Sequence, residues 1–293
     1  MMWLIFSILL IIVIYYIILD TSDKINENVK NLNKPLSTYE KLPKILYLIL
    51  YNENLDHENE MKRVLDRYVN NFSHVKTYFV AFKKLNNKEY EINGNTIYFN
   101  GIESYIPGVL DKTIKTIRLL TTNLTYDYLV RSNISTVIDL TKLTNLLANI
   151  KNTNIYATGW TLVGCKKCGP KNFLLSYASG TSIILDKVSA KYLLDNADKL
   201  RYDIIDDMSI GLLMKSNKGV KIYEFPGFKF NKINNIKLLY NYVNSPKLIL
   251  DSDPYAFKNI IFYRNKTKNR YHDIIKMNNF VNYLLDDTYF STK

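Results

Sequence analysis

Polar and charged residues follow three apolar runs of the sequence at the points where the runs end. The runs occupy 44–53, 96–101 and 126–133, and the polar residues at or just after their ends are Asn52, Glu53, Glu103, Arg131 and Asn133. If the runs are neighbouring parallel strands, their carboxyl ends meet at one edge of a sheet, where open α/β sheets bind ligands. The sequence therefore predicts a polar binding site at that edge.

Two adjacent carboxylates, Asp206 and Asp207, stand near the start of the segment IIDDMSIGLLMKSN at 204–217, which has helical character. Carboxylates at a helix N-terminus satisfy free backbone N–H groups and offset the helix dipole. Taken alone, the pair is best interpreted as such a cap.

A basic segment lies near the end of the chain. FYRNKTKNRYHDIIKM at 262–277 carries the cations Arg264, Lys266, Lys268 and Arg270 together with aromatic residues. One interpretation is a solvated basic loop. The other is that Arg264 and Lys266 contact an anionic group such as a diphosphate.

Thiol and imidazole chemistry is poorly supported. Cys165 and Cys168 form a Cys-x-x-Cys pair in a turn, and a zinc site would need two more ligands nearby. We expect a local disulfide or two free thiols there. The three histidines are widely spaced, which argues against a histidine metal site, and the Walker, HExxH and GxGxxG patterns are absent.

The elements that must position these residues alternate between strand and helix. Strand-type runs are predicted at 44–53, 75–82, 96–101 and 126–133, and helical segments at 57–69, 110–120 and 139–150. The second half adds strand-like runs at 155–164, 173–186 and 219–228, with helices between them. This alternation predicts a layered α/β fold with a mainly parallel sheet.

The composition excludes a disordered chain, because 47% of the residues are hydrophobic and 13% are aromatic. The net charge is +12, and lysine far outnumbers arginine. The basic residues are scattered singly, so we expect no nucleic-acid partner. Abundant Asn, Ile, Lys and Tyr suit the A/T-rich genome of a large DNA virus or microbe. A basic face that attracts nucleotide phosphates or acidic lipids is the functional alternative.

Met1 to Leu19 carries no charge and is apolar except for Ser7. At 1.5 Å per residue, such a run spans roughly 28 Å, close to the hydrocarbon thickness of a bilayer. A cleaved signal peptide would need a basic start and a small-residue cleavage site, and neither is present. We therefore predict a transmembrane signal anchor at 1–19, a polar stem at 20–42 and one domain at 43–293.

Four segments, in order, resemble the fringe-like and β-1,3-galactosyltransferase-type enzymes, which have a GT-A fold. NGIESYIPGVLDKTIKTI (100–117) resembles their block with a Lys-Thr pair, and YDYLVRSNISTVIDL (126–140) resembles the strand that ends in their DxD metal motif. YASGTSIILDKVSAKYL (177–193) resembles their Tyr-x-Ser/Thr-Gly-Gly strand, and IIDDMSIGLLMKSNKGV (204–220) their acidic helix start. The implied fold is a Rossmann-like mixed sheet flanked by helices, after a single N-terminal transmembrane helix.

The resemblance implies transfer of a sugar from a nucleotide sugar, here expected to be a UDP-sugar, to a hydroxyl of a glycan or glycoprotein. In an inverting enzyme one carboxylate takes the proton from that hydroxyl, and the matching position is Asp207. Asp206 would orient Asp207 or raise its pKa through like-charge proximity. The implied donor-binding residues are Glu53, Lys112, Arg131, Asn133, Ser135, Ser179, Gly180, Arg264 and Lys266.

The DxD motif is degenerate. Asn133 and Ser135 occupy its two acidic positions. Mn²⁺ and Mg²⁺ prefer anionic oxygen ligands, so two neutral ligands would hold either ion weakly. Three explanations stay open: a weakly held metal, a metal-independent enzyme that uses cations such as Arg131 and Lys112, or a relative that binds without catalysing.

Three functions follow in order of preference. The first is a single-pass, type II membrane glycosyltransferase with an extracytoplasmic or lumenal domain, consistent with Asn-x-Ser/Thr sequons such as the one at Asn71. The second is a catalytically silent protein that binds a nucleotide sugar or glycan. The third is an unrelated basic membrane protein that binds anionic lipid or nucleic acid.

Overall fold

The computed structural model describes residues 36, 41–150, 153–163, 176–217, 219–226, 228–231, 257 and 260–286. The chain divides into two compact units. The smaller unit comprises Met1–Leu42 and Thr141–Ile150. It contains helix α4 (Leu140–Ala148) except for its first residue. The larger comprises Pro43–Leu140 and Lys151–Lys293 and contains every residue of the site discussed below.

The larger unit is built on an eight-stranded sheet with the strand order β11-β7-β10-β5-β1-β2-β4-β3. In chain order the strands are β1 (Ile45–Leu50), β2 (Val75–Lys83), β3 (Tyr90–Asn93), β4 (Thr96–Asn100), β5 (Tyr128–Asn133), β7 (Ile155–Thr158), β10 (Ile183–Asp186) and β11 (Lys221–Glu224). The four strand-type runs predicted in the first half thus lie in the sheet, and the runs at 155–164, 173–186 and 219–228 each supply one strand to it.

The sheet is mixed, and four of the seven strand pairs that the structure describes in it are parallel, including β11 with β7 at one end. Strands β5, β1, β2 and β4 are parallel neighbours, but β10 runs antiparallel between β5 and β7, and β3 is antiparallel to β4. The β3–β4 hairpin turns at Gly94, whose φ of +58° is the left-handed conformation that glycine adopts without strain. The Asn93-Gly94 pair between the two short strands is the local sequence signal for this hairpin.

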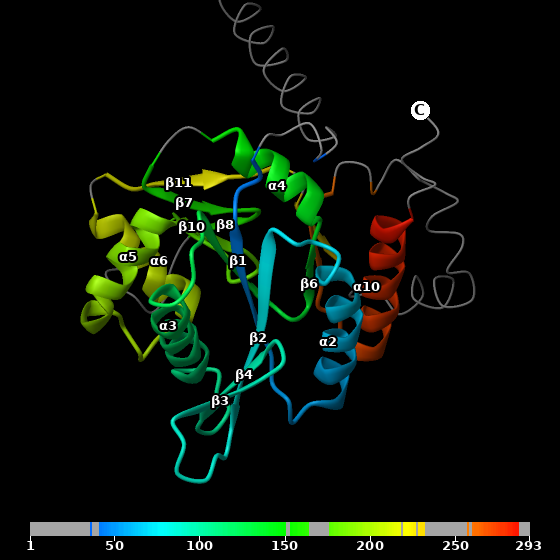
Figure 1. Cartoon of the computed structure of the whole chain (residues 1–293), viewed down its shortest axis with the longest axis horizontal. Coiled ribbons are helices and arrows are strands. Elements are labelled where there is room, and N and C mark those ends of the chain that lie inside the picture. The colour runs from blue at the N-terminus through cyan, green and yellow to red at the C-terminus, as the bar shows by residue number, and fades with distance from the viewer. Residues whose placement is uncertain are drawn as a thin grey trace, which may run out of the picture. The chain divides into compact units, whose positions relative to one another are not determined.

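Helices cover both faces of this sheet (Figure 1). Helices α3 (Gly108–Thr121), α5 (Lys187–Asp195) and α6 (Asp206–Ser216) lie on one face, and α2 (Asp56–Val69) and α10 (Arg270–Leu285) lie side by side on the other. Helix α2 buries Met61, Leu65, Tyr68 and Val69, which recur at helical spacing along one stripe. A short 3₁₀ turn, η2 (Ala197–Lys199), follows α5.

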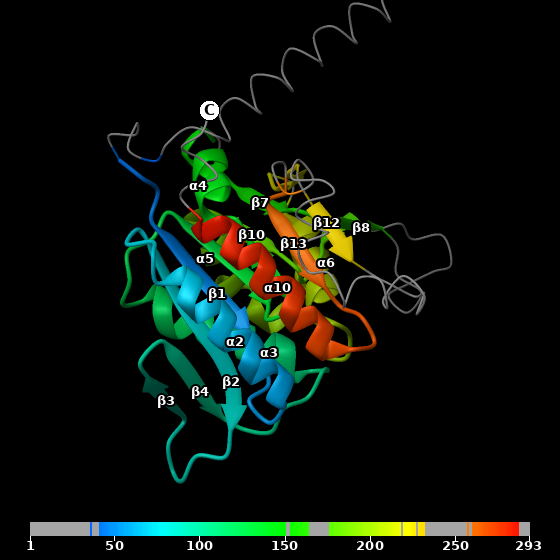
Figure 2. The same ribbon diagram turned by 90° about the vertical axis from the view of Figure 1, so that its right-hand side faces the viewer.

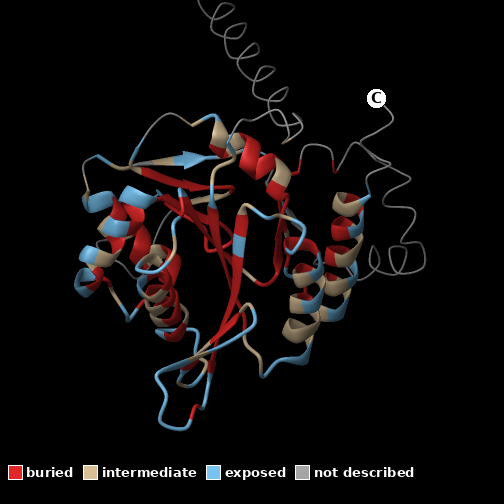
Figure 3. Cartoon of the chain, viewed as in Figure 1, coloured by how far each residue is buried: buried red, intermediate tan, exposed pale blue. Residues whose placement is uncertain are grey.

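The central strands form the core (Figure 3). All six residues of β1 are buried, because helices cover both faces of a strand at the middle of the sheet. On the α3 side, Leu46, Leu48 and Val80 pack with Ile114 and Ile117. This rigid centre holds the carboxyl ends of β1 and β5 side by side.

Two small sheets complete the unit. One joins β12 (Phe228–Asn231), β13 (Phe262–Asn265) and β6 (Thr136–Ile138), and the other pairs β8 (Thr161–Val163) with β9 (Ser176–Ala178). Strand β13 is antiparallel to β6, which follows β5 closely in the chain, so Arg264 pairs with Thr136. The basic segment near the end of the chain is therefore a strand and the start of a helix, joined by a short loop that carries Lys266 and Lys268 (Figure 2).

No helix in the described ranges is long and apolar enough to cross a bilayer. The predicted anchor at Met1–Leu19, most of the predicted stem at 20–42, and both Cys165 and Cys168 lie outside the described residues.

Candidate active site

The site lies where the strand order of the large sheet reverses direction. The chain passes from β1 to β2 on one side and later places β5 on the other side of β1, in parallel. In open α/β sheets this arrangement leaves a crevice at the carboxyl ends of the two strands. A cavity of about 380 Å³ lies there, and Leu50 and Asn133, which pair across β1 and β5, both line it.

Charged side chains from several elements line this cavity. They are Glu58 of α2, Glu103 of the loop before α3, Lys112 of α3, Asp206 and Asp207 of α6, Arg264 of β13, Lys266, and Arg270 of α10. The volume falls within the usual range of ligand pockets, roughly 300–1,000 Å³. The lining is far more polar than that of an ordinary apolar pocket, which suits a charged or sugar-like ligand.

Arg131 of β5 lies behind the acidic wall of the cavity. Its guanidinium is 1% exposed, with Nη1 donating to the Gly180 carbonyl (2.6 Å) and Nη2 forming an ion pair with Asp206 Oδ2 (2.5 Å). A Cβ at Gly180 would lie 2.6 Å from Nη1, so only glycine allows this approach. Arg131, which was predicted to contact the donor, is not among the lining residues, and its contacts with Gly180 and Asp206 position the turn at Gly180 and the start of α6.

Asp207 is buried in the first turn of α6, next to Asp206. The Gly180 N–H donates to its Oδ2 (3.0 Å), and the Met208 N–H donates to its Oδ1 (2.9 Å). Burial, followed by the neighbouring charge of Asp206, raises the pKa of Asp207 to about 6. The carboxylate therefore takes part in helix-start contacts, as a cap would, and also lines the cavity with a proton affinity suited to base catalysis near neutral pH.

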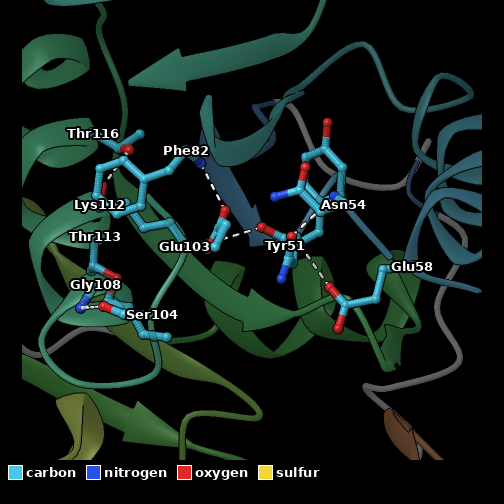
Figure 4. Close-up of polar contacts among 12 residues, drawn as sticks. Tyr51, Asn54, Glu58, Phe82, Glu103, Ser104, Gly108, Lys112, Thr113 and Thr116 are labelled. Carbon is cyan, nitrogen blue, oxygen red and sulfur yellow. Dashed lines mark hydrogen bonds and ion pairs between the residues drawn. The ribbon is translucent and has the colours of Figure 1, made fainter. Parts of the chain in front are cut away.

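Lys112 is held by two groups near the carboxyl ends of β1 and β2 (Figure 4). Its Nζ donates to both carboxylate oxygens of Glu103 (2.8 and 2.9 Å) and to the Tyr51 carbonyl (2.7 Å). Glu103 also accepts the Phe82 N–H (2.7 Å). Burial lowers the pKa of Lys112, while Glu103 opposes that shift. This cluster ties the loop before α3 to the ends of β1 and β2.

Three cations form another part of the lining: Arg264, Lys266 and Arg270. Burial, and then the charge of Arg131, lower the pKa of Arg264 to about 10. Arg270 donates to the Asn265 carbonyl (3.2 Å) and forms an ion pair with the fully buried Asp273. Lys266 is exposed overall, but part of its side chain is buried. This partial burial, and then the charges of Arg264 and Arg270, lower its pKa.

Most of the residues predicted for the site are brought together here. Those that line the cavity are Lys112, Asn133, Ser135, Gly180, Asp206, Asp207, Arg264 and Lys266. Glu53 is not among the lining residues and lies 3.7 Å from Lys83 in an ion pair. Ser179 is also outside the lining; it is buried, and its N–H donates to the Trp160 carbonyl (2.9 Å), so it shapes the turn that carries Gly180.

The sequence prediction missed several residues of the lining, among them Tyr105, Glu58 and Arg270. Tyr105 precedes α3 and is 67% exposed, and its pKa is raised by burial of its hydroxyl and by the charges of Asp206 and Asp207. Glu58 lies in the first turn of α2 and accepts the Asn52 N–H (2.7 Å). Arg270 belonged to the basic segment noted above, and only the β13–α10 turn brings it to the cavity.

The residues at the degenerate metal motif do not fit a tightly bound divalent cation. Asn133 and Ser135 both line the cavity, but they offer neutral oxygen atoms. Of the four carboxylates in the lining, Asp206 pairs with Arg131 and Glu103 with Lys112, while Asp207 and Glu58 accept backbone N–H groups. In the described part of the chain, no three His, Cys, Asp or Glu side chains group in a way that could hold a metal ion.

No family model matches the chain, and no curated protein sequence matches it. The fold is similar to that of a glycosyltransferase involved in glycosylation of the major capsid of PBCV-1, with a TM-score of 0.43 and 8% identity over 80% of this chain and 99% of that one. It is also similar to the glycosyltransferase GlyE of Streptococcus pneumoniae, with a TM-score of 0.41 and 13% identity over 85% of this chain and 64% of that one.

A third similar structure is the galactosyltransferase LgtC in complex with donor and acceptor sugar analogues. Its TM-score is 0.36, with 11% identity over 75% of this chain and 86% of that one. Because all three TM-scores are below 0.5, we base the function proposed next on the cavity and its residues.

Proposed function

We propose that this chain is a glycosyltransferase that moves a sugar from a nucleoside diphosphate sugar to an acceptor hydroxyl. The observation that carries the proposal is Asp207. It is a buried carboxylate with a pKa raised to about 6, and it lines a polar cavity at the reversal point of an open α/β sheet. Cations line the same cavity, as a diphosphate leaving group requires.

The proposed reaction is a direct displacement with inversion. The acceptor oxygen forms a bond to the anomeric carbon of the sugar, and the bond between that carbon and the diphosphate oxygen breaks. The acceptor proton passes to Asp207, and the nucleoside diphosphate leaves with the electron pair. Asp206 is a positioning residue in this scheme: its bond to Arg131 fixes the start of α6, and its charge helps to raise the pKa of Asp207.

We further propose that the donor is a UDP-sugar and the acceptor a glycan or glycoprotein. The similarity of four ordered sequence segments to fringe-like and β-1,3-galactosyltransferase-type enzymes supports this choice. The apolar run Met1–Leu19 supports a type II single-pass anchor with an extracytoplasmic domain.

One observation favours a second function. Asn133 and Ser135 stand where the related pattern has two metal-binding carboxylates. Without charge stabilisation on the leaving group, the chain would bind a nucleotide sugar and not transfer it. That alternative makes this chain a silent, sugar-binding relative.

A donor panel separates the two functions. The full chain in detergent is incubated with UDP- and GDP-sugars, with and without Mn²⁺, and release of the nucleotide is followed with and without an acceptor glycan mixture. Release that Asp207→Asn abolishes supports the transferase. Saturable donor binding with no release under any condition supports the silent relative. Absence of both binding and release contradicts both functions.

A further inference from the structure

We infer that Arg264, Lys266 and Arg270 form a cationic subsite for the diphosphate and take the place of a divalent metal ion. All three line the cavity, and a short segment from β13 to the start of α10 supplies them. The inference rests on the proposed function, since the cavity must bind a nucleoside diphosphate. It goes further by naming the groups that neutralise the leaving group.

The other cations near the cavity are committed elsewhere. The Arg131 guanidinium bonds to the Gly180 carbonyl and to Asp206, and it is 1% exposed. The Lys112 ammonium donates to Glu103 and to the Tyr51 carbonyl. Each neutralises a carboxylate of the protein, so neither brings an uncompensated positive charge to a ligand.

Lys266 lies between β13 and α10 and is placed differently, whereas Arg270 forms an ion pair with Asp273. Lys266 forms no hydrogen bond or ion pair with any residue that the structure describes, and its side chain is exposed at the cavity. Partial burial, and then the charges of Arg264 and Arg270, lower its pKa, while Glu58 opposes the shift. Like charges held together in this way repel one another, and a bound anion removes that repulsion. The cluster is therefore poised to bind a multiply charged ligand.

Arg270 is anchored so that it can present its charge to the cavity. Its Nη1 contacts the Asn265 carbonyl and the buried Asp273, which also accepts the Thr267 N–H. Those contacts fix the turn between β13 and α10 and hold the guanidinium at the cavity wall. An arginine fork suits the paired oxygens of a phosphate, and lysine adds a compact point charge.

The residues at the metal-motif positions agree with this assignment. Asn133 and Ser135 are neutral, so they cannot supply the anionic ligands that a hard cation prefers. They do offer a carboxamide N–H₂ and a hydroxyl, which can donate hydrogen bonds to phosphate oxygens. These two positions thus lack anionic ligands for a cation and offer donors for an anion.

The test measures UDP, UMP and uridine binding to the full chain by calorimetry, once in EDTA and once in Mn²⁺. The expected result is UDP affinity that agrees within about threefold between the two conditions. We expect Lys266→Met to weaken UDP binding about 10-fold or more, since a charge-assisted hydrogen bond is lost, while uridine binding is unchanged. The matched control Lys268→Met removes an exposed lysine that does not line the cavity, and should stay within twofold.

UDP binding that appears only with Mn²⁺ would overturn the cationic subsite and leave the transferase proposal standing. Equal weakening by Lys266→Met and Lys268→Met would also overturn it, because the effect would then reflect net charge alone. Absence of UDP-sugar and GDP-sugar binding in both conditions would contradict the proposed function itself, and the subsite with it.

Discussion

Arg131 on β5 forms an ion pair with Asp206 at the start of α6, with 2.5 Å between Nη2 and Oδ2, and both side chains are buried. The two residues lie far apart in sequence. Their contact joins the central sheet to the helix that carries Asp207, and the Arg131 bond to the Gly180 carbonyl joins the turn at Gly180 to the same point. The Arg131 guanidinium thus fixes the central sheet, the start of α6 and the turn at Gly180 relative to one another.

We predict that Arg131→Met destabilises the fold by roughly 3–5 kcal/mol, because Asp206 is left as an uncompensated buried charge. Urea unfolding followed by circular dichroism measures the loss. The double variant Arg131→Met with Asp206→Asn should recover part of the lost stability. The matched control Arg201→Met breaks an ion pair to Asp203 that is largely exposed and should change stability little. Equal effects of Arg131→Met and Arg201→Met would contradict the role given to Arg131.

Gly180→Ala tests the contact between Arg131 and Gly180 by changing Gly180 instead of Arg131. The new Cβ would lie 2.6 Å from Arg131 Nη1, so the guanidinium must move, at a cost of roughly 1–3 kcal/mol. Gly219→Ala is the matched control, since the nearest atom to its new Cβ is 3.6 Å away. We expect thermal unfolding at a lower temperature for Gly180→Ala only. A Gly180→Ala protein as stable as Gly219→Ala would show that Arg131 does not hold this position.

Lys112 was predicted from the sequence to contact the donor, and the structure gives it a structural partner. Lys112→Met leaves Glu103 buried without its counter-ion, so we expect a loss of roughly 3–5 kcal/mol in the free energy of unfolding. Lys115→Met on the same helix breaks a more exposed pair with Asp111 and should cost little. If Lys112→Met lowers UDP affinity without lowering stability, Lys112 binds the donor directly.

Much of the fold followed from local patterns. Strands β1, β2, β4 and β5 are apolar runs that end in polar residues, and such runs are recognisable without knowing their neighbours. Strand β13 and helix α10 were not recognised, because the cations between Arg264 and Arg270 hide both periodicities. The antiparallel placement of β10 depends on pairing with β5 and β7, which local sequence does not encode.

The candidate site was also predictable in part from local sequence. Asp207 and Asn133 stand at element ends, which is where the sheet architecture collects polar groups. Partner choice was not predictable: whether Lys112 faces a ligand or Glu103 depends on the path of the loop before α3. The same holds for Arg131, whose partner Asp206 is contributed by a helix far along the chain.

The anchor prediction concerns residues outside the described ranges. Removing residues 1–25 should release the protein from membranes and leave the larger unit folded, since its core strands begin at Ile45. Membrane pelleting of the full and truncated chains, with circular dichroism of the supernatant, measures both properties. A truncated chain that still pellets with membranes, or that does not fold, would contradict the prediction.

The account depends most on Asp207, and the rate of sugar transfer against pH tests it most directly. A base acts as its carboxylate, so the wild-type rate should fall about tenfold per pH unit below pH 6, near the raised pKa of Asp207, and level off above it. Asp207→Asn keeps the side-chain shape and should lower transfer by roughly 10²- to 10⁴-fold, with no inflection near pH 6 and nearly unchanged UDP affinity. A variant that transfers sugar at the wild-type rate, with the same inflection near pH 6, would contradict the account.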